Sequence, residues 1–256
     1  MSVVQHEAAD GVGRILLDRP EQLNAITVEL GRQFEAALRE LGTRPDVTVI
    51  LVRGAGGNFS AGGDFREVDR LRAEGPASLV PLFDNFGRAC AVVAEIEPPV
   101  VAAVEGVAMA GGFEFMLAAD IVLVRDDARI ADNHINHGQI PGGGSSQRLP
   151  RLVGRQRALG LLLSGERLSG RDAVALGLAH RSFAPDEFDD RVEAFVTTLA
   201  RRRRDALGGI KRLVHDGLAT SLQAGLALER ERVVAHISGE AGGAGVDSFT
   251  SKEAQP

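Results

Sequence analysis

The chain has 256 residues, of which 44% are hydrophobic and 25% charged, a composition typical of a globular protein that buries a core without cross-links. Its formal net charge of −6 argues against a general nucleic-acid binder. Cys90 is the only cysteine, which excludes an internal disulfide and favours a reducing, cytoplasmic location. The opening "MSVVQHEAADGVGR" lacks a basic segment followed by an apolar run, and carboxylates interrupt the most apolar stretch, 99–124. We therefore expect neither a signal peptide nor a membrane span.

The first half of the chain alternates between strand and helix patterns. Segment 12–20 is typical of a strand that ends at a proline, and the β-branched run 47–54 predicts a strand buried on both faces. Between them lies an amphipathic helix with apolar side chains at Leu30, Phe34, Leu38 and Leu41. The alternation predicts an α/β fold.

The same alternation continues to about residue 126. A long helix is expected over 79–97, with Cys90 on its apolar face, and Pro98-Pro99 ends it. A strand at 100–106, a turn and helix within 109–120, and a strand at 121–126 complete the series.

The C-terminal part is helical and rich in arginine. We expect two units, an α/β core over 1–200 and a helical region over 201–256 that holds an oligomer together. The run Arg201–Arg204 points around a helix, so most of it is expected on a solvated face or at a subunit contact.

Glycine-rich turns follow several of these strands. None has the third glycine of a dinucleotide fingerprint or the GK[ST] ending of a phosphate loop, so conventional nucleotide binding is not expected. "SAGGD" and "MAGGFE" instead offer backbone N–H groups, at Ala61 and at Gly111, that two loops could direct at one oxygen atom. One well-placed donor of this kind contributes about 3 to 4 kcal/mol to a transition state. Spacing alone favours the simpler interpretation that these glycines only permit tight turns.

Five sequence blocks in register resemble the crotonase superfamily, also called the enoyl-CoA hydratase/isomerase family. The blocks are "LDRPEQLNAI", "NFSAGGDFRE", "PPVVAAVEGVAMAGGFEFMLAADIVL", "GQIPGGGSSQRLPRLVG" and "LLLSGERLSGRDAVALGLAHRSF". The resemblance implies a crotonase-like spiral of ββα units with a C-terminal helical oligomerisation region. It further implies trimers or hexamers, an acyl-CoA thioester substrate, no metal, and no separate cofactor, because CoA is part of the substrate.

The resemblance also assigns site residues. It places an oxyanion hole at the N–H groups of Ala61 and Gly111, and CoA along the backbone near Ala25 and from Ala61 to Asp64, including Gly62 and Gly63. The tail "FTSK" resembles a stretch that touches CoA, which would involve Phe249 and Lys252. From their position alone, Asp64 and Glu67 are expected to cap a helix.

Family hydratases use two glutamates, and this chain keeps one of them. Glu114 occupies the first position, among apolar neighbours that predict a buried carboxylate. His134 stands at the second position, so ordinary hydration by two carboxylates is in doubt. Some family hydrolases of β-diketones have a histidine there, but they also carry an acidic residue in the next loop, where this chain has Gly143.

The stretch "ADNHINHGQIPGGG" therefore has three interpretations. Asp132, His134 and His137 could bind a metal, although their spacing matches no strong zinc pattern. His134 is instead expected to be an acid/base group, since an imidazole titrates near neutral pH. His137 is expected to be structural.

Three functions fit these residues. The leading hypothesis is an acyl-CoA hydratase or lyase in which Glu114 activates water and His134 takes the second proton-transfer role. The second is a hydrolase of a thioester or β-diketone with His134 as the base. The third is a catalytically silent acyl-CoA-binding protein, because a fold does not fix a function.

Overall fold

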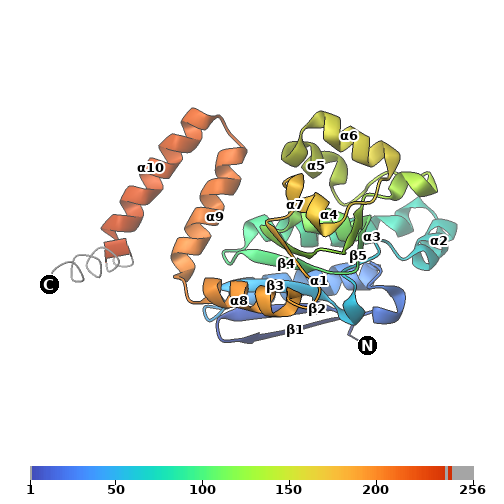
Figure 1. The fold of residues 1–256 in the computed structure, drawn as a ribbon, viewed down its shortest axis with the longest axis horizontal. Coiled ribbons are helices and arrows are strands. Elements are labelled where there is room, and N and C mark those ends of the chain that lie inside the picture. The colour runs from blue at the N-terminus through green and yellow to red at the C-terminus, as the bar shows by residue number, and fades with distance from the viewer. Residues whose placement is uncertain (1, 240–241, 244–256) are drawn as a thin grey trace.

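The computed structural model describes residues 2–239 and 242–243 (Figure 1). Its centre is a sheet of six strands in the order β1-β2-β3-β4-β6-β8, in which β1 is antiparallel to β2 and the other neighbours are parallel. The strands are β1 (Val4–Ala9), β2 (Val12–Leu17), β3 (Val49–Gly54), β4 (Val100–Val104), β6 (Ile121–Arg125) and β8 (Arg181–Phe183). Two short parallel strands, β5 (Val107–Met109) and β7 (Arg129–Ala131), form a second sheet.

Both faces of the main sheet are buried, as the runs of β-branched residues predict. On one face, the side chains of Ile50, Val52 and Val100 join a large core that includes Phe34 and Phe86 of two helices. On the other face, the intervening residues of the same strands, among them Val49, Leu51 and Val101, form a second core. Phe188 and Val192 of α8 pack into this core. The alternation of side chains along each strand thus supplies both layers.

Residues 2–239 contain ten α-helices. They are α1 (Val28–Thr43), α2 (Phe65–Glu74), α3 (Pro76–Glu95), α4 (Gly111–Ala118), α5 (Ser145–Val153), α6 (Arg155–Ser164), α7 (Gly170–Ala175), α8 (Phe188–Ala200), α9 (Arg204–Leu218) and α10 (Leu222–Ser238). The helix predicted over 79–97 begins earlier, at Pro76, and a separate helix, α2, precedes it. Gly75 separates the two with φ +114°, a conformation that glycine adopts readily. The strand predicted over 12–20 ends at Leu17.

The helices α9 and α10 lie side by side and extend away from the sheet (Figure 1). Lys211 fixes α9 to the core, because its ammonium group is buried and lies 2.8 Å from the Asp120 carboxylate and 3.0 Å from the Pro98 carbonyl oxygen. The prediction that Arg201–Arg204 continue around one helix is wrong, since α8 ends at Ala200 and α9 begins at Arg204. Arg204 donates to the carbonyls of Gly42 and Val47 and so anchors the start of α9.

None of the helices within residues 2–239 has the length and apolarity that a membrane span requires. Cys90 is fully packed inside the larger core, as its place on an apolar helix face predicts.

Candidate active site

A cavity of about 380 Å³ opens between α2 and α3 on one side and the start of α4 and the β7–α5 connection on the other. Most of its wall is apolar. This part is formed by Ile26, Phe65, Val68, Leu79, Leu82, Phe83 and Phe86. One end is polar and is lined by Gly63, Gly111, Glu114, Asn133, His134 and Gly143. An apolar pocket with a few convergent polar groups is the usual form of a small-molecule site.

Glu114 is held at the polar end by the backbone of the next loop. Its side chain comes from α4, a helix buried along its whole length, and the residue is only 3% exposed. Its Oε1 accepts hydrogen bonds from the N–H groups of Gly143 (2.7 Å) and Ser145 (3.2 Å). Burial raises the pKa of the Glu114 carboxyl above its ordinary value, although these two bonds and the charge of His134 oppose the change.

Gly143 leaves room for this carboxylate. A Cβ atom at this position would lie 2.6 Å from Oε2 of Glu114 and 2.7 Å from the ring of Phe86, so no larger residue fits without rearrangement. The arrangement therefore has no space at residue 143 for the acidic residue of the similar β-diketone hydrolases.

His134 begins the short 3₁₀ helix His134–His137 that follows β7. Its Nδ1 lies 2.7 Å from Oδ1 of Asp132, which leaves Nε2 as the nitrogen without a protein partner among the described residues. Burial lowers the pKa of the His134 imidazole, but the hydrogen bond and charge of Asp132, with the charge of Glu114, outweigh it and the pKa ends above the ordinary value. A histidine with one nitrogen bound to a carboxylate and the other free is suited to proton transfer.

His137 has different surroundings. It also lines the cavity, but its ring packs against the ring of Phe65, with the centroids 5.3 Å apart. Within residues 2–239 and 242–243, no group of three or more histidine, cysteine or acidic side chains is arranged to hold a metal ion. Asp132 contacts His134 by a hydrogen bond instead.

The two glycine-rich loops meet at the polar end of the cavity, but one predicted donor is not available there. The N–H of Ala61 donates to the carbonyl of Leu23 at 2.9 Å, so the prediction that Ala61 supplies an oxyanion donor does not fit the structure. The N–H groups of Gly63 and Gly111 have no acceptor among the described residues, and both glycines line the cavity. Gly63 is therefore the donor on the first loop that the structure leaves free.

Close packing of glycines brings the two loops that carry these N–H groups together. A Cβ atom on Gly62 would lie 3.2 Å from the nitrogen of Gly111 and 2.6 Å from the Cβ of Ala110, so only glycine permits this approach. Gly111 is also the first residue of α4, where backbone N–H groups lack helical acceptors and attract negative charge. The role of the Gly111 N–H as an oxyanion donor stays a prediction.

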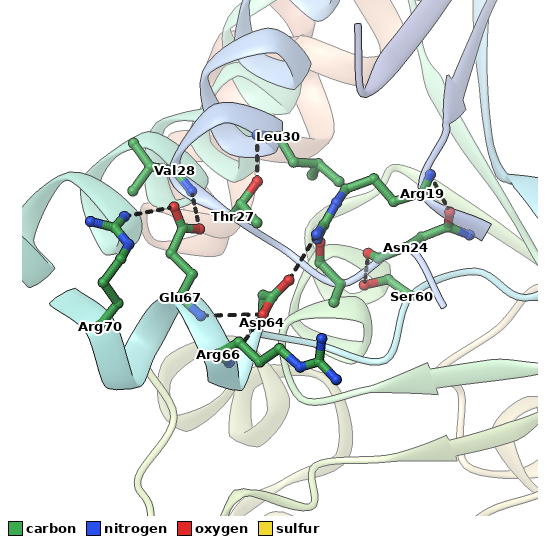
Figure 2. Close-up of polar contacts among 11 residues, drawn as sticks. Arg19, Asn24, Thr27, Val28, Leu30, Ser60, Asp64, Arg66, Glu67 and Arg70 are labelled. Carbon is green, nitrogen blue, oxygen red and sulfur yellow. Dashed lines mark hydrogen bonds and ion pairs between the residues drawn. The ribbon is translucent and has the colours of Figure 1, made fainter. Parts of the chain in front are cut away.

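A network of polar side chains holds in place the loop that carries Gly63 (Figure 2). The Arg19 guanidinium lies 2.8 Å from the Asp64 carboxylate and also donates to the carbonyl of Ala25. Asn24 is fully buried and donates to the carbonyls of Ala55 and Asn58 at 2.9 Å and 2.7 Å. These contacts set the loop geometry that carries Gly63.

Asp64 caps α2, as its position in the sequence predicts. Its Oδ1 accepts from the N–H groups of Arg66 (3.1 Å) and Glu67 (3.3 Å), while Glu67 accepts from the N–H of Val28 at 3.1 Å (Figure 2). The side chain of Asp64 is thus committed to structure. Any contact of this residue with CoA would have to come from its backbone.

Two predicted CoA contacts cannot be placed. Phe249 and Lys252 lie outside the described residues.

Comparisons with known proteins show the family of the chain. A family model described as "Enoyl-CoA hydratase/isomerase" matches residues 7–255, nearly the whole chain. The chain belongs to this family. Among its relatives, the "Probable enoyl-CoA hydratase echA8" of Mycobacterium leprae is 33% identical over 220 residues, which cover 86% of this chain and 83% of that protein.

Solved structures of family members share the fold as well. The crystal structure of an enoyl-CoA hydratase from Polaromonas sp. JS666 covers 97% of this chain and 97% of that one, with a TM-score of 0.93 and 28% identity. An enoyl-CoA hydratase subunit from Geobacillus kaustophilus matches with a TM-score of 0.90 and 30% identity, over 98% of this chain and 96% of that chain. The predicted crotonase-like fold with C-terminal helices is therefore confirmed.

Sequence reasoning missed three features of this family member's site. The partner of His134 is Asp132, which the sequence suggested only as a metal ligand. Gly63 was assigned to CoA binding and not to the oxyanion position. Ser145, which binds Glu114 through its N–H, carries no sequence signal beyond its place after the glycine run.

Proposed function

We propose that this protein adds water to the double bond of an enoyl-CoA thioester. The observation that carries the proposal is the juxtaposition of Glu114, His134 and two free backbone N–H groups at the polar end of an apolar cavity. The apolar wall suits an acyl chain, and the polar end suits the thioester and the attacking water. Membership of the enoyl-CoA hydratase/isomerase family supports the same activity.

The roles follow from the chemistry of each group. The thioester oxygen would accept from the N–H groups of Gly63 and Gly111, which stabilise the enolate that forms when a nucleophile adds at C3. The Glu114 carboxylate would remove a proton from water as the hydroxyl bonds to C3. The imidazolium of His134 would then give its Nε2 proton to C2. The product therefore differs from the substrate by one added water molecule. A proton then passes from Glu114 to His134, which returns both side chains to their starting protonation states.

CoA would lie across the loop that carries Gly63. Ala25 and Gly62, which directly precedes Gly63, are both buried, so in the proposed complex they support the backbone that contacts CoA. No metal and no cofactor separate from the substrate take part in the proposed reaction.

The test is an assay of crotonyl-CoA hydration, in which the loss of the absorbance of the conjugated thioester measures the rate. His134→Ala should lower kcat by roughly 10² to 10⁴, the contribution of a positioned acid or base. His137→Ala is the matched control, because His137 lines the same cavity but packs on Phe65. Full hydration by His134→Ala, or no hydration by the folded wild-type protein, would contradict the proposal.

A hydrolase is the second candidate, and the contact between Asp132 and His134 favours it. A carboxylate on Nδ1 leaves Nε2 able to accept a proton, as a general base must. This activity would release free CoA thiol or cleave a β-diketone, so thiol release and acid formation should be measured with the same protein. Acyl-CoA binding without any turnover would instead indicate a silent binding protein.

A further inference from the structure

Asp132 is a buried carboxylate that the proposed reaction does not use directly. The residue directly follows β7, is only 3% exposed, and lies 2.7 Å from Nδ1 of His134 through its Oδ1. The His134 backbone N–H also points to this oxygen, at 3.4 Å. Burial of a carboxylate costs several kcal/mol unless a partner compensates it. His134 is the partner that this carboxylate has.

The contact determines which imidazole nitrogen is free. A carboxylate accepts only, so the neutral His134 ring must carry its proton on Nδ1 and present the lone pair of Nε2. In the imidazolium form both nitrogens carry protons, and the Nε2 proton is the one available for transfer. Asp132 thus selects one tautomer and one ring orientation.

Ser145 lies beside both carboxylates. It is fully buried at the start of α5, and its N–H donates to Oε1 of Glu114 at 3.2 Å. Burial acts to raise the pKa of the Asp132 carboxyl, but the hydrogen bond with His134 and the nearby Ser145 hydroxyl outweigh it, so the pKa is lowered. Oδ2 of Asp132 and Oγ of Ser145 are both buried and have no hydrogen-bond partner among the described residues.

The geometry points to Asp132 as a positioning residue that holds His134 for proton transfer. The inference rests on the proposed function, because the position of His134 affects turnover only if His134 transfers a proton. The contact itself can be tested without turnover.

The test compares wild type with Asp132→Asn by deuterium exchange at the C2–H of each imidazole, resolved by mass spectrometry. Besides Asp132, the titratable groups that act on His134 or share its 3₁₀ helix are Glu114 and His137. These groups remain in the variant. Loss of the Asp132 charge should lower the His134 pKa by about 1 unit or more.

The same variant is then assayed with crotonyl-CoA. We expect kcat to fall by at least about 10-fold with KM changed by less than about 2-fold, because the substrate contacts remain. The basic limb of the pH profile should move to lower pH by the same shift as the His134 pKa. Asp127→Asn is the control, since Asp127 is an exposed aspartate in the turn before β7 and pairs with Arg125.

The outcomes separate the two proposals. An unchanged His134 pKa in Asp132→Asn overturns the positioning role, and so does a lowered pKa with unchanged kcat. Full activity of His134→Ala refutes the proposed function instead, while the exchange measurement still decides whether Asp132 holds the ring. If Asp132→Asn does not fold, the wild-type protein decides, because a His134 pKa at or below the ordinary value of about 6.5 overturns the inference.

Discussion

Two titratable side chains with opposite requirements share the polar end of the cavity. Burial raises the pKa of Glu114 and favours its neutral form, whereas the carboxylates around His134 raise its pKa and favour the charged form. A hydratase needs Glu114 ionised and His134 protonated at once, so each group stabilises the reactive state of the other. A hydrolase with His134 as the base needs the neutral imidazole.

The pH dependence of kcat therefore distinguishes the two activities. For hydration, the rate should rise with pH as Glu114 loses its proton and fall as His134 loses its proton. Both limbs should lie above the ordinary pKa values of glutamate and histidine, because both pKa values are raised. For hydrolysis, the rate should only rise as His134 deprotonates. A rate that does not change between pH 5 and pH 9 would contradict a role for either group.

The elements of the site differ in how well the sequence predicts them. The 3.6-residue period of α1 and the β-branched run of β3 determine those elements locally, and both predictions are confirmed. The strands β5 and β7 have three residues each, too few to show a period, and they form only by pairing with each other. These two strands nevertheless determine where Gly111 and Asp132 lie, because Gly111 closely follows β5 and Asp132 directly follows β7.

The error at Ala61 has the same origin. Ala61 has no free N–H because it donates to the carbonyl of Leu23, a residue 38 positions earlier in the segment that the Arg19–Asn24 hydrogen bond closes. No local pattern records that contact. The hydrogen bond between Asp132 and His134 could not be predicted from the sequence either. Side chains two residues apart make contact only where the backbone turns, and here it turns at the 3₁₀ helix that begins at His134.

The start of α4 offers a matched pair of variants for the oxyanion proposal. Gly111→Pro removes the N–H and should lower kcat by at least about 100-fold, the effect of losing one oxyanion donor. Gly111→Ala keeps the N–H and adds a Cβ atom 2.4 Å from the flexible end of Ile26, so it controls for the added bulk. Steady-state kinetics on crotonyl-CoA would compare the two after circular dichroism confirms folding. Equal activity of the proline and alanine variants would refute a donor at Gly111.

At the scale of the whole molecule, the helices α9 and α10 present many large apolar side chains that no other described residue covers. Its exposed members are Ile210, Val214, Leu218, Leu222, Leu226, Val233, Val234 and Ile237. A concentration of exposed apolar side chains on two neighbouring helices is typical of a protein interface. We propose that residues 201–256 form the oligomerisation region, that residues 1–200 form the core that carries the site, and that the assembly is a homotrimer or a hexamer made of two trimers.

Removal of residues 201–256 would test this proposal poorly, because it also removes Lys211 and leaves the buried Asp120 carboxylate without its ammonium partner.

Single changes in the full chain avoid this problem. Val214→Glu on α9 and Leu226→Glu on α10 place a charge where the native side chains are 54% and 56% exposed in the single chain, so the monomer should fold normally. Burial of an unpaired carboxylate in an interface costs several kcal/mol, and both variants should dissociate into monomers. Light scattering after size-exclusion chromatography would measure the mass, with Thr198→Glu on the exposed side of α8 as the control. If both variants keep the mass of the wild-type assembly, or if the wild-type protein is a monomer, the apolar surface of α9 and α10 is not the oligomer interface.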